Sequence, residues 1–425
     1  MKFIFGDDAF SRETLRAMGY ACYGGADIGE VLMITRKIPE GDELAWHREW
    51  KAGAERQEQL AQRSLDACNP ASARHSLLRA SNYYRCAEYF RRDDPSNDSE
   101  VVSLSRRSRC AFLAAMALSG NGFEQIKIPY EGTTLPGYVH TVDRSGRPRP
   151  TLIVTASLDS TLEESYFAIA AAALERGYNV LAYDGPGQGA TLRENHLMFR
   201  PDWEAVVAPV IDYAIGRPEL SSHQLIGFGY SLGAYLAARA AAFDPRLAAL
   251  ILNDGICDFR AAVERVLPPF LLDWIRRRHD ESANPVLALH MSTDIRFNWA
   301  MRHGMWSMGA STPADLTRAF LDYSLTEVAE RIRIPTLVLD AENDQFLHGQ
   351  ALSTVRAIGD TWATLATLTI DEGAGEHCHV GAMPRAHQVI FDWLGGVAAP
   401  AATSPSTSVQ SATAATPTSA LPETT

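Results

Sequence analysis

The chain has 425 residues, of which 46% are hydrophobic and 21% charged, a composition typical of a globular protein with room for one catalytic domain and added parts. Its formal net charge of −12 argues against a nucleic-acid-binding surface. Six cysteines without paired spacing, an acidic start and the lack of a long apolar run predict a cytoplasmic protein with reduced thiols, no signal peptide and no membrane segment.

Residues 1–119 are predicted to form a helical region, because they show helical periodicity and no strand alternation. Its expected helices lie at 43–67, 71–90 and 105–118, and a glycine-containing segment at 23–30 is expected as a tight turn. The many aromatic and leucine positions of the region need a partner surface. We therefore expect it to be a lid that cannot be separated from the catalytic domain.

The pattern changes near residue 120 to strands that alternate with helices, and 120–256 is expected as the first part of the catalytic core. Strands are predicted at 124–129, 135–142, 151–155, 178–183, 223–227 and 247–252, and helices at 162–176, 203–215 and 234–243. This alternation predicts an α/β fold with a mostly parallel sheet and helices on both faces.

Three further segments complete the expected organisation. Residues 257–325 again show a helical sequence pattern and are rich in Trp and Met, which predicts an inserted helical cap. The core resumes over 326–396, with strands at 335–339 and 364–370 and a last helix at 385–394. Residues 397–425 are rich in Ala, Thr, Ser and Pro, which predicts a disordered tail.

A Gly-x-Ser-x-Gly motif joins a short apolar strand to an Ala-rich helix, the context of a nucleophile elbow. Gly229 and Gly233 allow strand and helix to approach closely, and Ser231 between them is the predicted nucleophile. The N–H of Leu232, which opens the helix, is expected to help bind an oxyanion.

The acid and the base of such a site should follow the serine in the order Ser, Asp or Glu, His. Asp344 lies in the loop beyond a predicted strand and is the expected acid, with Asp340 or Glu342 as alternatives. The loop after the last predicted strand carries His377 and His379. We expect His377 to be the base, because it directly follows the glycine-containing loop.

The oxyanion site needs a second backbone donor, which we assign to Leu158 in the loop after the third strand. No His-Gly-Gly-Gly sequence stands there, which argues against a lipase. His377 and His379, together with Asp371 and Glu376, are the alternative as a metal site. Because nothing else in the chain clusters as ligands, we expect no metal and no cofactor.

Candidate substrate contacts are Tyr230, Asp159, Trp299 and Trp306. The two tryptophans belong to the aromatic- and Met-rich cap, for which core packing is the competing interpretation.

Several motifs together resemble one family. They are Tyr23-Gly24-Gly25-Ala26-Asp27, Ser81-Asn82-Tyr83-Tyr84-Arg85, Leu158-Asp159-Ser160-Thr161-Leu162-Glu163-Glu164 and Gly373-Ala374-Gly375-Glu376-His377-Cys378, beside the elbow and Asp184-Gly185-Pro186-Gly187-Gln188-Gly189. Over residues 10–396 the chain resembles the α/β-hydrolase family of 2,6-dihydroxypseudooxynicotine hydrolase and related hydrolases of polyketide biosynthetic clusters.

The resemblance implies an α/β-hydrolase fold whose helical N-terminal region and cap cover the site, a Ser231–Asp344–His377 triad and frequent homodimers. It also implies cleavage of carbon–carbon bonds next to ketones, with relatives that act on esters or transfer acyl groups. The oxyanion loop departs from the family's usual Gly-Gly and has Ala156-Ser157. Some relatives use an additional carboxylate, for which Glu264 or Asp258 is the candidate here.

The sequence therefore predicts a serine hydrolase without a cofactor, acting on a small molecule and on neither nucleic acid nor membrane. The expected reaction is carbon–carbon bond cleavage next to a ketone in a polyketide-like or aromatic multi-carbonyl substrate. The alternatives are an esterase, lactonase or acyltransferase with the same triad, and a catalytically dead hydrolase fold that serves as a binding protein.

Overall fold

The computed structural model describes residues 3–397, so the predicted tail beyond Val397 lies outside the described residues. Its centre is an eight-stranded sheet in the order β1-β2-β4-β3-β5-β6-β7-β8. The strands are β1 (Gly122–Tyr130), β2 (Thr133–Thr141), β3 (Arg149–Thr155), β4 (Asn179–Tyr183), β5 (Leu220–Tyr230), β6 (Ala249–Asn253), β7 (Thr336–Ala341) and β8 (Ala363–Leu368). The β1–β2 and β2–β4 pairs are antiparallel and all others are parallel, which confirms the predicted α/β class.

Two apolar clusters cover the two faces of the sheet, because alternate strand residues point to opposite sides. Leu152 and Val154 of β3 belong to the cluster that also contains α6, α16 and the N-terminal helices, whereas Ile153 faces α8, α9 and α15. The helical segments of this core are η2 (Tyr166–Ala170), α6 (Ala171–Glu175), α7 (Gly189–Asn195), α8 (Glu204–Ile215), α9 (Leu232–Ala241), η3 (Ala329–Arg331), α15 (Gln350–Ile358), η4 (His377–His379) and α16 (Met383–Val397).

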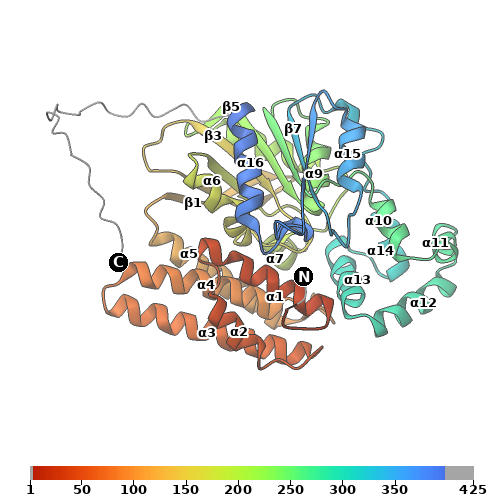
Figure 1. Ribbon diagram of the computed structural model, residues 1–425, viewed down its shortest axis with the longest axis horizontal. Coiled ribbons are helices and arrows are strands. Elements are labelled where there is room, and N and C mark those ends of the chain that lie inside the picture. The colour runs from red at the N-terminus through yellow and green to blue at the C-terminus, as the bar shows by residue number, and fades with distance from the viewer. Residues whose placement is uncertain (1–2, 398–425) are drawn as a thin grey trace, which may run out of the picture.

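The N-terminal region is helical, as its composition predicts. It contains α1 (Asp8–Gly19), η1 (Tyr20–Tyr23), α2 (Ile28–Thr35), α3 (Glu43–Asp66), α4 (Pro70–Glu88) and α5 (Ser99–Ala117). An Asp or Asn side chain caps the first turn of each of these five α-helices: Asp7, Asp27, Asp42, Asn69 and Asp98. Figure 1 shows the five helices gathered along one side of the sheet domain.

The segment at 23–30 differs from the single turn that its glycines suggest. The turn is confined to Gly24, whose φ of 79° suits glycine, and α2 already begins at Ile28. The Asp27 side chain accepts hydrogen bonds from the Gly29 and Glu30 N–H groups, so the second half of the segment is a capped helix start.

The cap lies between β6 and β7 and forms a separate arm beside the sheet (Figure 1). Its helices are α10 (Phe259–Val266), α11 (Pro269–Arg276), α12 (Asp280–Thr293), α13 (Ile295–Met308) and α14 (Pro313–Phe320). They share a small apolar cluster of their own, and Trp299 on α13 joins the main cluster instead. Within residues 3–397, no helix combines the length and apolarity needed to cross a membrane.

Candidate active site

Ser231 occupies a sharp turn between β5 and α9. Its backbone has φ 54° and ψ −128°, a conformation that L-residues rarely adopt, and its N–H donates to the Asn253 carbonyl at 2.6 Å. A side chain at Gly229 would overlap the Gly233 carbonyl, and one at Gly233 would overlap the Thr155 carbonyl. The two glycines are therefore required by close backbone approach, as a nucleophile elbow demands.

The side chains of Ser231, His377 and Asp344 form one continuous hydrogen-bonded chain. His377 Nε2 lies 2.9 Å from Ser231 Oγ, and His377 Nδ1 lies 2.7 Å from Asp344 Oδ2. These three residues follow β5, β7 and β8, whose carboxyl ends meet at one edge of the parallel sheet. The arrangement allows His377 to take the hydroxyl proton of Ser231 while Asp344 fixes its tautomer.

The negative groups around His377 favour its protonated form, although burial opposes it. Burial opposes the charged ring, but the surrounding negative groups, led by Asp344, raise the pKa of His377 well above its ordinary value. Burial would raise the pKa of Asp344, yet the opposite charge of His377 lowers it, helped by hydrogen bonds from the Leu347 and Phe346 N–H groups. Asp344 is therefore ionised whenever His377 accepts a proton.

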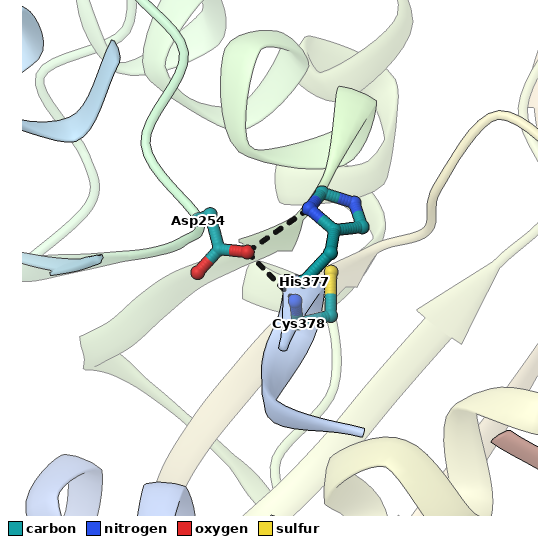
Figure 2. Close-up of side chains that lie close together, drawn as sticks. All are labelled: Asp254, His377 and Cys378. Carbon is teal, nitrogen blue, oxygen red and sulfur yellow. Dashed lines mark hydrogen bonds and ion pairs between the residues drawn. The ribbon is translucent and has the colours of Figure 1, made fainter. Parts of the chain in front are cut away.

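Asp254 is a second carboxylate on His377, and sequence reasoning missed it. Its Oδ2 lies 3.1 Å from His377 Nδ1 and accepts the Cys378 N–H at 2.7 Å (Figure 2). The residue directly follows β6 and is 2% exposed. A position just beyond the carboxyl end of a parallel strand was the available signal.

His379 contacts Asp254 and not Ser231. Its Nδ1 is 2.7 Å from the Ala374 carbonyl, so Nδ1 carries the proton of that hydrogen bond. Its Nε2 then faces Asp254 Oδ1 at 3.3 Å, and both of these buried atoms lack a hydrogen bond. A proton on either atom would satisfy both.

The alternative carboxylates lie elsewhere. Asp340 accepts from the Thr367 hydroxyl at 3.2 Å, and Glu342 accepts from the Ile370 N–H at 2.7 Å. Asp258 caps α10, and Glu264 forms an exposed ion pair with an arginine of the cap. None of the four is among the described residues that line the cavity around Ser231.

The two expected oxyanion donors come from the first residue of α9, Leu232, and from the loop after β3, Leu158. Neither the Leu232 nor the Leu158 N–H has a hydrogen-bond acceptor within residues 3–397. Gln188 holds the loop of Leu158 by donating to the Ala156 carbonyl at 2.7 Å. From the cap, His303 Nε2 donates to the Leu158 carbonyl at 3.1 Å, because His303 Nδ1 accepts from Arg92 at 3.0 Å.

The cavity that exposes Ser231 and His377 is lined by residues of both the core and the N-terminal region. Tyr230 and Asp159 lie in its wall. Trp299 stacks on Tyr89, with ring centroids 4.4 Å apart, and Trp306 packs against two buried arginines. Of these four predicted contacts, the two tryptophans serve packing between the cap and the N-terminal helices and do not line this cavity.

Asp254, His377 and Cys378 place three potential metal-ligating atoms within 4.8 Å of one another (Figure 2). The Nδ1 atom of His377 already contacts two carboxylates, so a cation there would displace the bonds that orient the ring. The geometry fits proton transfer by His377 better than metal binding.

Comparison with known proteins places the chain in a family. The sequence model of the serine aminopeptidase S33 family matches residues 162–370. The hydrolase LUC6 of a Fusarium species is 34% identical over 92% of this chain and 97% of its own length. The alpha/beta hydrolase psoB of Aspergillus fumigatus is 32% identical over 92% of this chain and 93% of its own. This chain belongs to the α/β hydrolases.

Further similarities agree with this assignment. The 20-hydroxy-prefusarin hydrolase FUS2 of Gibberella moniliformis is 33% identical to this hydrolase over 92% of the chain and 97% of its own length. The crystal structure of 2,6-dihydroxy-pseudo-oxynicotine hydrolase matches with a TM-score of 0.71 at 22% identity, covering 89% of this chain and 95% of that one. The predicted family resemblance is confirmed, and the structural match shows that the fold extends through the helical N-terminal region.

Proposed function

We propose that this α/β hydrolase uses Ser231 as nucleophile, His377 as base and Asp344 as the acid that orients His377. The observation that carries the proposal is the unbroken chain from Ser231 Oγ through His377 to Asp344, with separations of 2.9 and 2.7 Å. Nucleophile, base and orienting carboxylate in this geometry are what acyl transfer to serine requires.

The proposed reaction is hydrolysis of a carbon–carbon bond next to a ketone in a polyketide-like or aromatic multi-carbonyl substrate. Ser231 attacks the ketone, and the oxyanion accepts hydrogen bonds from the Leu232 and Leu158 N–H groups. The carbon–carbon bond then breaks, its electrons pass to a leaving carbanion stabilised by a neighbouring carbonyl, and His377 protonates that carbon. Water, activated by His377, hydrolyses the acyl-serine and releases the acid.

Three observations support this proposal. The raised pKa of His377 favours the protonated ring, which is the form that can deliver a proton to a carbon leaving group. The N-terminal helix α1 forms part of the cavity wall, and His303 of the cap bonds to the loop after β3, so both helical regions cover the site where a carbanion must be kept from water. The relative FUS2 is a 20-hydroxy-prefusarin hydrolase, which supports a specific small molecule as substrate.

The second candidate function is ester or lactone hydrolysis, or acyl transfer, by the same residues. It is supported by the same geometry, because attack on an ester needs the same nucleophile, base and oxyanion donors. The two reactions differ in the leaving group, which is a carbanion in one and an alkoxide in the other.

The catalytic assignment is tested with a fluorophosphonate probe and the Ser231→Ala variant. We expect the probe to label the wild-type protein at Ser231 and the variant to lose about 10⁴- to 10⁶-fold in turnover without loss of fold, because nucleophile and base act as a unit. Absence of labelling in the folded wild-type protein would instead favour the binding-protein alternative.

The reaction is tested by comparing kcat/KM for a panel of β-diketones and acylphenols with that for matched p-nitrophenyl esters. The carbon–carbon proposal expects efficient turnover of at least one ketone. If the enzyme turns over esters but no ketone, the result would favour an esterase or acyltransferase and contradict carbon–carbon bond cleavage.

A further inference from the structure

Arg12 on α1 brings a cation to the same cavity as Ser231 and His377, and the mechanism above does not use it. Its Nε atom is buried and has no hydrogen-bond partner. Within residues 3–397 no carboxylate lies within 4.0 Å of its guanidinium, although guanidinium groups stay charged at all working pH values.

The neighbouring Arg16, one helical turn further along α1, is the opposite case. It pairs with Asp159 at 2.7 Å and with both oxygens of Glu164 at 2.7 and 2.8 Å, and it contacts Glu13 at 3.3 Å. Arg16 is therefore saturated by acids of the protein. Of the two arginines in the cavity wall, only Arg12 has donors left for a ligand.

The side chain of Arg12 is held in place by an aromatic ring. Its guanidinium lies 4.5 Å from the centre of Phe346, and that ring meets His377 edge-on at 5.2 Å. Phe346 thus holds Arg12 beside the base, while the Nε donor of the guanidinium has no acceptor among the described residues.

The acids near Arg12 are already engaged. Burial would raise the pKa of Asp159, but Arg16 lowers it, with a smaller contribution from Arg12. Asp159 gives its short ion pair to Arg16, and Asp254 and Asp344 face His377. Arg12 is therefore the cation of the cavity wall that can form an ion pair with a bound anion.

We infer that Arg12 is the substrate-recognition residue of this site and that it binds a planar anion with two oxygens, such as a carboxylate or the enolate of a 1,3-dicarbonyl. The inference deepens the proposed function and rests on it, since it assumes that the substrate carbonyl lies at Ser231. The forked guanidinium matches two coplanar oxygens, and such bidentate bonds are among the strongest between side chain and ligand.

The test compares two esters with acyl chains of equal length. Mono-p-nitrophenyl glutarate ends in a carboxylate, and p-nitrophenyl pentanoate ends in a methyl group. Arg12→Gln should lower kcat/KM for the glutarate ester about tenfold to hundredfold, chiefly through KM, and leave the pentanoate ester within about threefold. Arg12→Lys keeps the charge without the fork and should fall between wild type and Arg12→Gln.

Arg296 provides a matched control, because its guanidinium also lies over Phe346, at 5.7 Å, but its Nη1 donates to Gln345 and it does not line the cavity. Arg296→Gln should keep the wild-type ratio between the two esters. An unchanged ratio in Arg12→Gln, or an equal fall for both esters, would overturn the inference. If Ser231 is not the nucleophile and neither ester reacts, calorimetry with glutarate still decides: wild type must bind it and Arg12→Gln must not.

Discussion

Asp254 gives His377 a second negative neighbour, and its effect should be visible in the pH dependence of the reaction. A base must be neutral to accept the proton of Ser231, so kcat/KM rises with pH through the pKa of His377. Asp254 lies 3.1 Å from Nδ1 and supports the protonated ring, as do the other negative groups that raise this pKa. Asp254→Asn should therefore move the rising limb of the profile to lower pH, by roughly one unit or more.

The control for this variant is Asp340→Asn, which removes a carboxylate within β7 that contacts Thr367 rather than His377. Its profile should coincide with that of wild type. A rising limb that stays in place in Asp254→Asn would show that Asp344 alone sets the pKa of His377.

The elbow requires glycine at position 233, because there is no space for a Cβ atom there. A Cβ there would overlap the Thr155 and Ala156 carbonyls, which are backbone atoms of the sheet and of the oxyanion loop and cannot turn aside. Gly233→Ala should lower the free energy of unfolding in urea by about 1 to 3 kcal/mol or more. Gly120→Ala is the control, since a Cβ at Gly120 meets nothing within 4 Å, and a large loss there would contradict the steric explanation.

Sequence reasoning reached the residues that a motif or the chain order specifies. Ser231 stands in a five-residue pattern, and the order of acid and base along the chain singled out Asp344 and His377, which the structure brings into contact with it. Asp254 and Arg12 carry no such pattern. The first reaches His377 from the end of β6, which β7 separates from β8 in the sheet, and the second comes from a helix more than 200 residues before the nucleophile, so only tertiary packing reveals them.

At the scale of elements, helix α13 of the cap is tied to the oxyanion loop through His303. Its ring stacks on Trp299 at 5.0 Å and donates to the Leu158 carbonyl. Burial and the adjacent Arg92 lower the pKa of His303 to about 3, so the ring stays neutral and this link does not change between pH 5 and 9. We regard His303 as a positioning residue for the Leu158 N–H.

His303→Phe tests this role, because phenylalanine keeps the stacking on Trp299 and removes both hydrogen bonds. We expect kcat to fall about tenfold to hundredfold, less than for direct loss of an oxyanion donor, with KM little changed. In His303→Gln the side-chain amide can both donate and accept a hydrogen bond, so this variant should recover part of the lost kcat. His290→Phe on α12 is the control, since that ring stacks on Phe297 away from the loop. Equal losses of kcat in both variants would refute the positioning role.

The strands were the best-predicted elements, because buried parallel strands are short apolar runs bounded by turns. All eight predicted strands are present, within a few residues of their expected ends. The helical sequence pattern of the cap predicted its helices, but it did not predict what the individual residues contact. Trp299 and Trp306 pack against Tyr89 and Arg92 of the N-terminal region, partners that lie more than 200 residues away in the chain.

At the scale of the whole molecule, the N-terminal region and the hydrolase core share one interior. Tyr20 stacks on Phe167 at 5.3 Å, and Arg16 of the region pairs with the buried Glu164 and the partly buried Asp159 of the core. The main apolar cluster contains residues of α1, α3, α4 and α5 together with strands of the sheet. The cavity wall itself is therefore made by both parts.

A chain that begins at Gly122 should consequently be insoluble or inactive. The truncation would expose the apolar face that the N-terminal helices cover, where each large side chain contributes roughly 1.5 to 3 kcal/mol, so that a few of them equal the net stability of a domain. It would also leave Glu164, which is 2% exposed, without Arg16. The comparison is a chain that ends at Val397, since the composition of 398–425 predicts little buried area and an unchanged melting temperature. A soluble and fully active protein starting at Gly122 would show that the N-terminal helices are accessory and would remove Arg12 from the site.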